Sequence, residues 1–199
     1  MSHPVVASLR DHYRTLLEEH GDSATATQMS AEGKLYRYRK LFEIGDLNDR
    51  SVLDLGCGLG EMYRPLVDRW PRARYHGVDL VPEMVAAARR LHPNLSFDTL
   101  DLLAGQAPGR FDYVLMSALF NNATAEATEY LEAVVARAWA IADRGIGFNF
   151  LPVQVNFQEP TMAYHDPARV LDFLLRKISP RVRLEHHYER CDVAVFALR

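Results

Sequence analysis

Residues 52–61 read Val-Leu-Asp-Leu-Gly-Cys-Gly-Leu-Gly-Glu, and they constrain the fold more than any other segment of this chain. An apolar run that ends in closely spaced glycines is typical of a buried strand that turns sharply into a helix. A second apolar run ends at Asp79, roughly 20 residues further along. In βαβ units with this layout, the glycines let a nucleoside approach the backbone and the carboxylate accepts hydrogen bonds from ribose hydroxyls. The segment therefore predicts an α/β fold with a nucleoside site.

The spacing of the glycines bears on which nucleoside can bind. A dinucleotide-binding turn has the pattern Gly-x-Gly-x-x-Gly, and the pyrophosphate lies at the helix N-terminus. Here the third glycine, Gly60, comes one residue early, and Glu61 stands where the last glycine is expected. A carboxylate beside two phosphates is unfavourable because like charges repel at short range. The pattern favours a nucleoside without phosphate, such as S-adenosylmethionine (SAM).

Four motifs in order resemble those of the class I SAM-dependent methyltransferases, and the resemblance covers about residues 30–199. The first motif, Asp-x-Gly-x-Gly-x-Gly, lies at residues 54–60, and the second is the acidic strand end at Asp79. The third is Asp101, and the fourth is the apolar run at residues 111–117. The resemblance implies a transferase whose cofactor is SAM.

Apolar runs and helical periodicity alternate regularly from residue 51 onward. Strands are expected at residues 51–55, 74–79, 95–99, 111–117 and 145–150. Helices are expected at residues 60–69, 82–91 and 125–142. This order predicts a Rossmann-like α/β fold in which a mostly parallel sheet has helices on both faces.

The two ends of the chain depart from this alternation. After a helix at 166–178, strands at 181–188 and 192–198 are joined by a short turn at 189–191. They predict an antiparallel hairpin at the sheet edge, which brings the sheet to seven strands as the resemblance also implies. Helices at 4–20 and at 30–44, the latter capped by Ser30, form an N-terminal cover (1–48) ahead of a core (49–199). No linker is visible, so a single domain, 1–199, is expected.

Composition excludes several classes of protein. The net charge of −3 over 199 residues offers no basic field for nucleic acid. No apolar run is long enough to span a bilayer, and charged residues interrupt any signal peptide. Cys57 and Cys191 have neither metal-ligand spacing nor a disulfide framework, so we expect no metal site and reduced thiols in a cytoplasmic protein.

The resemblance implies that SAM contacts lie within the motifs and directly after the strands. The predicted cofactor-binding residues are Asp54, Gly56, Cys57, Gly58, Asp79, Leu80, Met84, Asp101, Leu102 and Ser117. Arg37, before the first strand, could pair with the methionine carboxylate or be a solvated cation beside Arg39 and Lys40. Tyr13 could close over the cofactor or make an ordinary helix contact.

Residues after the fourth and fifth strands are candidates for chemistry because ligands of open α/β sheets bind at the carboxyl ends of strands. Asn121, Asn149 and Tyr164 offer hydrogen bonds, and Phe120 and Tyr164 offer π faces to a sulfonium cation.

Several neighbours of these candidates have competing interpretations. Asn122 or Thr124 could cap the following helix, and Asp166 before Pro167 is a typical N-cap. His165 could be a general base or a plain loop residue. The aromatic residues that flank Asn149, Phe148 and Phe150, are expected in the core.

Two reactions fit one cofactor. The first interpretation is methyl transfer to a small-molecule acceptor, in specialised metabolism. A small acceptor is expected because only the N-terminal cover and the 151–165 loop could shape an acceptor pocket. The alternative comes from a similarity to azetidine-2-carboxylate synthases, in which the amino group of SAM attacks its own Cγ and expels 5′-methylthioadenosine. A catalytically silent SAM-binding partner is a third possibility. We expect no nucleic acid or membrane partner, and a monomer or homodimer.

Overall fold

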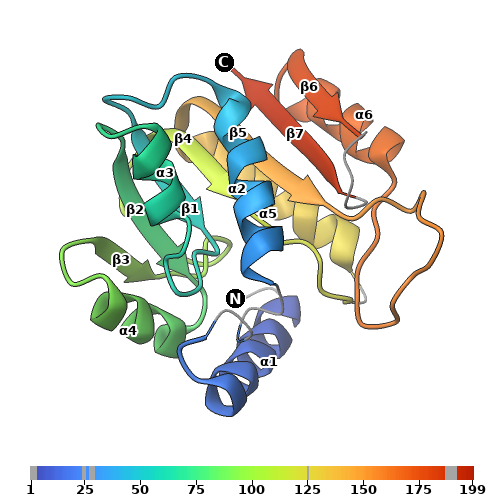
Figure 1. Ribbon diagram of the computed structural model, residues 1–199. Coiled ribbons are helices and arrows are strands. Elements are labelled where there is room, and N and C mark those ends of the chain that lie inside the picture. The colour runs from blue at the N-terminus through green and yellow to red at the C-terminus, as the bar shows by residue number, and fades with distance from the viewer. Residues whose placement is uncertain (1–3, 24–25, 27–29, 125, 187–191) are drawn as a thin grey trace.

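The computed structural model describes residues 4–23, 26, 30–124, 126–186 and 192–199. Within these residues, one twisted sheet lies between two groups of helices (Figure 1). The strands are β1 (Ser51–Leu55), β2 (Arg74–Asp79), β3 (Ser96–Thr99), β4 (Phe111–Met116), β5 (Ala142–Phe150), β6 (Arg181–Glu185) and β7 (Val193–Leu198). The helices are α1 (Pro4–His20), α2 (Ala31–Leu41), α3 (Tyr63–Arg69), α4 (Pro82–Leu91), α5 (Ala127–Ile141) and α6 (Pro167–Lys177), with a short 3-10 turn, η2 (Phe42–Ile44), after α2.

The sheet has the order β3-β2-β1-β4-β5-β7-β6 in the described part of the chain. Strands β1 to β5 run parallel to one another, while β7 is antiparallel to both β5 and β6. The predicted fold class, with its mostly parallel sheet and antiparallel C-terminal edge, is therefore confirmed. The order reverses between β1 and β4, which is where open α/β sheets bind ligands.

Apolar side chains fill the space on both faces of the sheet. One buried cluster joins α2, α3 and α4 to one face through Leu41, Leu66 and Val85. The other joins α5 and α6 to the opposite face through Leu131 and Leu174. Strands covered on both sides read as continuous apolar runs rather than as alternating ones.

Helix α1 lies beyond the carboxyl ends of the parallel strands (Figure 1). Its residues Val5, Val6 and Leu9 are buried in the core. Further along the helix, Tyr13 and Leu17 pack against the cluster formed around α4. The predicted N-terminal helical cover is thus held by apolar contacts across the end of the sheet.

Two elements begin three residues away from their predicted starts, whereas the others begin within two residues of theirs. Helix α3 begins at Tyr63 rather than at residue 60, because Gly60 has φ +78°, which no right-handed helix accommodates. Strand β5 begins at Ala142 rather than at residue 145, because Ala142 pairs with Phe111 across an irregularity in the β4–β5 register. The predicted turn at 189–191 and Cys191 lie outside the described residues.

Local capping bonds test three of the predictions. Ser30 accepts a hydrogen bond from the Gly33 amide at 3.1 Å, and Asp166 accepts one from the Ala168 amide at 2.9 Å, so both N-caps are confirmed. The prediction that Asn122 or Thr124 caps α5 is wrong, because the N-cap position is Glu126.

Among the described residues, no helix is both long enough and apolar enough to cross a membrane.

Candidate functional site

A hollow lies beyond the carboxyl ends of β1, β2 and β4, where the glycine turn, the end of β2 and the segment after β4 meet. Most of the predicted cofactor-binding residues line it, namely Gly56, Cys57, Gly58, Asp79, Leu80, Met84, Asp101, Leu102 and Ser117. The structure therefore brings these predicted residues together around one hollow.

The floor is the turn after β1, which backbone hydrogen bonds tie to β2. The amides of Gly56 and Cys57 both donate to the Val78 carbonyl, at 2.8 and 3.0 Å. The Gly58 amide donates to Oδ2 of Asp79 at 2.8 Å. Gly58 has φ +52°, which favours glycine, and the lack of a side chain leaves its backbone open to a ligand. These hydrogen bonds hold the turn against the end of β2.

Asp79 is the anionic centre of the hollow. Its Oδ1 accepts a hydrogen bond from the Val81 amide at 2.9 Å, and its Oδ2 accepts the bond from Gly58. Burial raises the pKa of Asp79, while these backbone bonds act in the opposite direction. A carboxylate offers about four lone-pair sites, so acceptor capacity remains for a pair of ligand hydroxyls. This arrangement suits a ribose.

The third motif forms an apolar slot beside Asp79. Leu100, Leu102 and Met84 line this part of the hollow together with Asp101. Oδ1 of Asp101 accepts a hydrogen bond from the Leu103 amide at 3.0 Å, which orients the carboxylate. An apolar slot with one carboxylate at its edge fits a planar base that carries an amino group.

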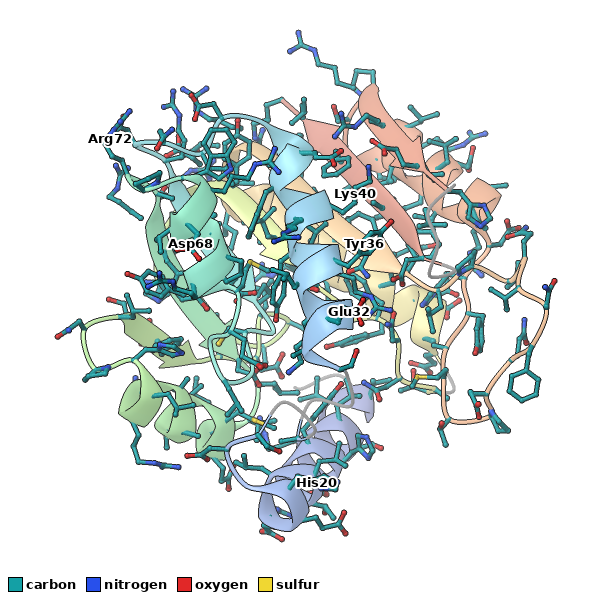
Figure 2. The ribbon with its side chains drawn as sticks, in the orientation of Figure 1. His20, Glu32, Tyr36, Lys40, Asp68 and Arg72 are labelled. Carbon is teal, nitrogen blue, oxygen red and sulfur yellow. The ribbon has the colours of Figure 1, made fainter. Side chains whose placement is uncertain are left out.

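A buried lysine of α2, which was not predicted as a site residue, also lies at the hollow. Lys34 is only 3% exposed, lines the hollow and donates from Nζ to Oε2 of Glu61. The signal was present in the sequence, since Lys34, Tyr38 and Leu41 share the buried face of α2 at helical spacing. Figure 2 shows Glu32, Tyr36 and Lys40 on the outward face of the same helix. A lysine on the buried face of a helix is unusual and indicates a functional site.

The segment after β4 brings polar groups to the hollow without partners. Ser117 and Asn121 both line it, and the Ser117 Oγ and Asn121 Oδ1 atoms are buried with no hydrogen-bond partner among the described residues. Buried polar atoms are usually satisfied, so these two are candidates for bonds to a bound ligand. Asn122, in contrast, donates to the Tyr13 hydroxyl at 2.6 Å. This bond and the lining position of Tyr13 favour the interpretation that α1 closes over the hollow.

Three of the four residues predicted to carry chemistry do not line the hollow. The ring of Phe120 is buried against Phe148, with centroids 5.7 Å apart. The Tyr164 hydroxyl accepts a hydrogen bond from the Glu159 amide within its own loop, at 2.9 Å. Asn149 is buried beneath the hollow and accepts from the Ala118 amide at 2.8 Å. Only Asn121 is where it was expected, because position after a strand does not decide which way a side chain points.

Two predicted cofactor residues also lie away from the hollow. Arg37 is not a solvated cation, because its Nε lies 2.6 Å from Oδ2 of the buried Asp192. Asp54 is buried, and its Oδ2 accepts a hydrogen bond from the Tyr75 hydroxyl at 2.8 Å. Neither Arg37 nor Asp54 is among the residues that line the hollow.

His165 is a structural residue rather than a base exposed to the hollow. The side chain is buried, Nε2 lies 3.0 Å from the Phe120 carbonyl, and burial lowers its pKa. Phe148 and Phe150 are fully buried, as predicted. No group of metal-ligating side chains occurs in the part of the chain that the structure describes.

The buried Asp54 leads to a prediction about stability and pH. Burial raises its pKa from 3.8 to about 7. Between these two values the folded protein keeps a proton that the unfolded chain has released, so the free energy of unfolding falls as pH rises and levels off above about 7. From pH 5 to pH 8, wild type should lose roughly 3 kcal/mol relative to Asp54→Asn, as urea unfolding at both pH values would measure. Identical pH dependence in the two proteins would contradict the assignment.

Comparison with known sequences gives matches that cover up to 69% of this chain. A family model described as a methyltransferase domain matches residues 52–140. A Mycobacterium tuberculosis protein named as a methyltransferase is 32% identical over 145 residues, which cover 69% of this chain and 86% of that protein. Malonyl-[acyl-carrier protein] O-methyltransferase of Acetivibrio thermocellus is 35% identical over 40% of this chain and 30% of its own length. Trans-aconitate 2-methyltransferase of Escherichia coli is 38% identical over 36% of this chain and 28% of its own length.

Solved structures share the whole fold. Magnesium protoporphyrin IX methyltransferase from Synechocystis, in a crystal structure with bound SAM, superposes with a TM-score of 0.70 at 20% identity. The match covers 98% of this chain and 96% of that one. Human N-acetylserotonin methyltransferase, also in complex with SAM, has a TM-score of 0.65 at 16% identity and covers 97% of this chain and 66% of its own. At these identities the likeness concerns the fold.

Proposed function

Because this chain belongs to the class I SAM-dependent methyltransferases, we propose that it transfers the methyl group of SAM to a small-molecule acceptor in specialised metabolism. The observation that carries the proposal is one hollow in which the glycine turn, Asp79, Asp101 and Lys34 converge beneath a closed N-terminal helix. Its polar groups fit the parts of SAM, and two of them, Ser117 Oγ and Asn121 Oδ1, have no hydrogen-bond partner among the described residues.

Each end of the hollow suits one part of the cofactor. Asp79 accepts hydrogen bonds from the ribose, and Asp101 with its apolar neighbours holds the adenine. Lys34 pairs with the methionine carboxylate, a role that the sequence had suggested for Arg37. Glu61 lies beside Lys34 and, with Asp79, would repel a pyrophosphate. The same charges therefore favour SAM over a dinucleotide.

The protein's part in the reaction is positioning. SAM supplies an electrophilic methyl group on its sulfonium, so a base is needed only when the acceptor carries a proton on its nucleophilic atom. The hollow keeps this centre away from water through α1, which the Tyr13–Asn122 hydrogen bond holds in place. Holding the acceptor in line with the bond to be broken supplies most of the acceleration in such transfers.

The walls of the hollow favour a small acceptor. The amide of Ala123 donates to the Thr161 carbonyl at 3.0 Å, and the amide of Ala163 donates to the Asn121 carbonyl at 2.9 Å. These bonds tie the 151–165 loop to the segment after β4, so that Met162 also lines the hollow. A protein or nucleic acid chain would have to displace both the loop and α1. The trans-aconitate in the name of one relative is an acceptor of small size and supports the same class.

The cyclase alternative loses most of the residues assigned to it. In the cyclase alternative, Tyr164 would help Asn121 to hold the amino group of SAM and Phe120 would face its cation, yet neither Tyr164 nor Phe120 lines the hollow. Only Asn121 remains for that role. Methyl transfer needs none of them, which is why it is the function proposed.

One incubation tests the proposal and separates the two reactions. The purified protein is mixed with SAM, alone and with pools of small carboxylic acids, phenols and amines, and the products are identified by mass spectrometry. Methyl transfer predicts S-adenosylhomocysteine and a methylated product only when an acceptor is present. Methylthioadenosine and a cyclic amino acid from SAM alone would instead establish the cyclase, and binding without any product would indicate a silent partner.

Lys34→Met should weaken the binding of SAM about 10- to 100-fold, because a charge-assisted hydrogen bond to the methionine carboxylate is lost. Methylthioadenosine has the same adenosine and no carboxylate, so its affinity should stay unchanged. Calorimetry with both ligands measures the difference. Lys40→Met, on the outward face of α2 (Figure 2), is the matched control. An equal loss for both ligands would show that Lys34 acts through the fold.

The proposal extends to the state of the protein in the cell. We expect a cytoplasmic monomer or homodimer without nucleic acid or membrane partners. The net charge of −3 supports the expectation that no nucleic acid binds. Light scattering of the purified protein gives the oligomeric state directly.

A further inference from the structure

Three side chains from distant parts of the sequence form a buried polar network. Arg37 comes from α2, Asn149 from β5, and Asp192 directly precedes β7. Arg37 Nε lies 2.6 Å from Oδ2 of Asp192, and Asn149 Nδ2 lies 3.5 Å from Oδ1 of the same carboxylate. Asp192 is fully buried and Asn149 is 1% exposed. A buried carboxylate is tolerated when such partners compensate its charge.

This arrangement fixes which way the Asn149 amide faces. Its NH₂ group is directed to Asp192, so its Oδ1 is directed to the opposite side, where it accepts the Ala118 amide at 2.8 Å. Ala118 has φ +56°, a backbone conformation that side chains other than glycine rarely adopt. The hydrogen bond from Asn149 therefore holds a strained turn in place.

The strained turn forms part of the wall of the hollow. Ser117, Ala118 and Leu119 all line it, and the unpartnered Oγ of Ser117 belongs to this turn. At the other end of the chain of contacts, Arg37 lies one helical turn after Lys34 on α2. That helix crosses β5 and β7 in Figure 1. One buried carboxylate thus joins the two walls of the hollow.

We propose that Asn149 is a positioning residue for the cofactor pocket, oriented by the Arg37–Asp192 ion pair so that it holds the turn at residues 117–119. The inference rests on the proposed function, since it takes the hollow to be the SAM site. It differs from the role predicted from sequence, because Asn149 touches the turn and not the ligand.

Exchanging the two buried side chains tests this directly. Asn149→Asp places two carboxylates side by side and should weaken SAM binding about 10-fold, because small misplacements of binding groups have large effects. The double variant Asn149→Asp with Asp192→Asn again has one carboxylate and one amide in this pair of positions, now exchanged. It should regain affinity to within about threefold of wild type. Asp143→Asn, at the exposed start of β5, is the control and should bind as wild type does.

Calorimetry of SAM binding, with the melting temperature of each variant, distinguishes positioning from stability alone. A fall in melting temperature with unchanged affinity in Asn149→Asp would overturn the inference, as would a double variant no better than the single one. If Asn149→Asp does not fold, Arg37→Lys keeps the charge but loses the planar guanidinium, and a roughly threefold weaker affinity is expected. Unchanged affinity there would also overturn it. A wild-type protein that binds no SAM would refute the proposed function instead.

Discussion

Replacing Asp79 by alanine should weaken the binding of SAM about 100-fold, because two ribose hydroxyls lose a shared charged acceptor. The turn is affected as well, since Asp79 also accepts the amides of Gly58 and Val81. Calorimetry or equilibrium dialysis with SAM and S-adenosylhomocysteine measures the loss. Both ligands should weaken alike, because they carry the same ribose.

A surface aspartate provides the control for this variant. Asp68, labelled in Figure 2, is more than half exposed and pairs with Arg64 on α3. Asp68→Ala removes the same charge from the protein and should leave the affinity for SAM unchanged. If Asp79→Ala binds SAM as tightly as wild type, the ribose does not lie at the end of β2.

Gly60→Ala should lower the free energy of unfolding by roughly 3 kcal/mol, through a strained backbone and a crowded core together. Gly60 has φ +78°, and an added Cβ would lie 2.8 Å from Cζ of Phe97. Phe97 is 3% exposed and so has little room to move. Urea unfolding, followed by circular dichroism, measures the change.

Gly21→Ala separates the two causes. Gly21 has a similar φ of +60°, but an added Cβ there would meet nothing within 4 Å. Its loss of stability should be about 1 kcal/mol, which is the backbone cost alone. Equal losses at both positions would mean that Phe97 yields to the new methyl group.

Local patterns in the sequence carried the fold and the floor of the site. The glycine spacing, the acidic strand end and the apolar runs each depend on residues close together in the chain, and the structure places Gly58, Asp79 and Asp101 in one hollow as expected. The mostly parallel sheet with helices on both faces followed from the same alternation, because a chain of this kind has few ways to bury both faces of its sheet.

The residues that the sequence misplaced depend on contacts between distant segments. Arg37 faces Asp192, 155 positions later in the chain, and Asn149 faces the turn at Ala118. Neither partner can be identified from the neighbouring sequence. Phe120 follows a strand as a ligand-binding residue would, yet its ring turns to Phe148 because burial of an aromatic ring is favourable. Lys34 was not predicted as a site residue, because a lysine is usually expected at the surface and this one is buried.

A crystal structure with S-adenosylhomocysteine tests the central claim most directly. We expect the ribose hydroxyls within hydrogen-bonding distance of Asp79, the adenine beside Asp101, and the amino acid carboxylate at Lys34. A ligand bound elsewhere, or a hollow left empty at saturating ligand, would contradict the claim that this site binds SAM.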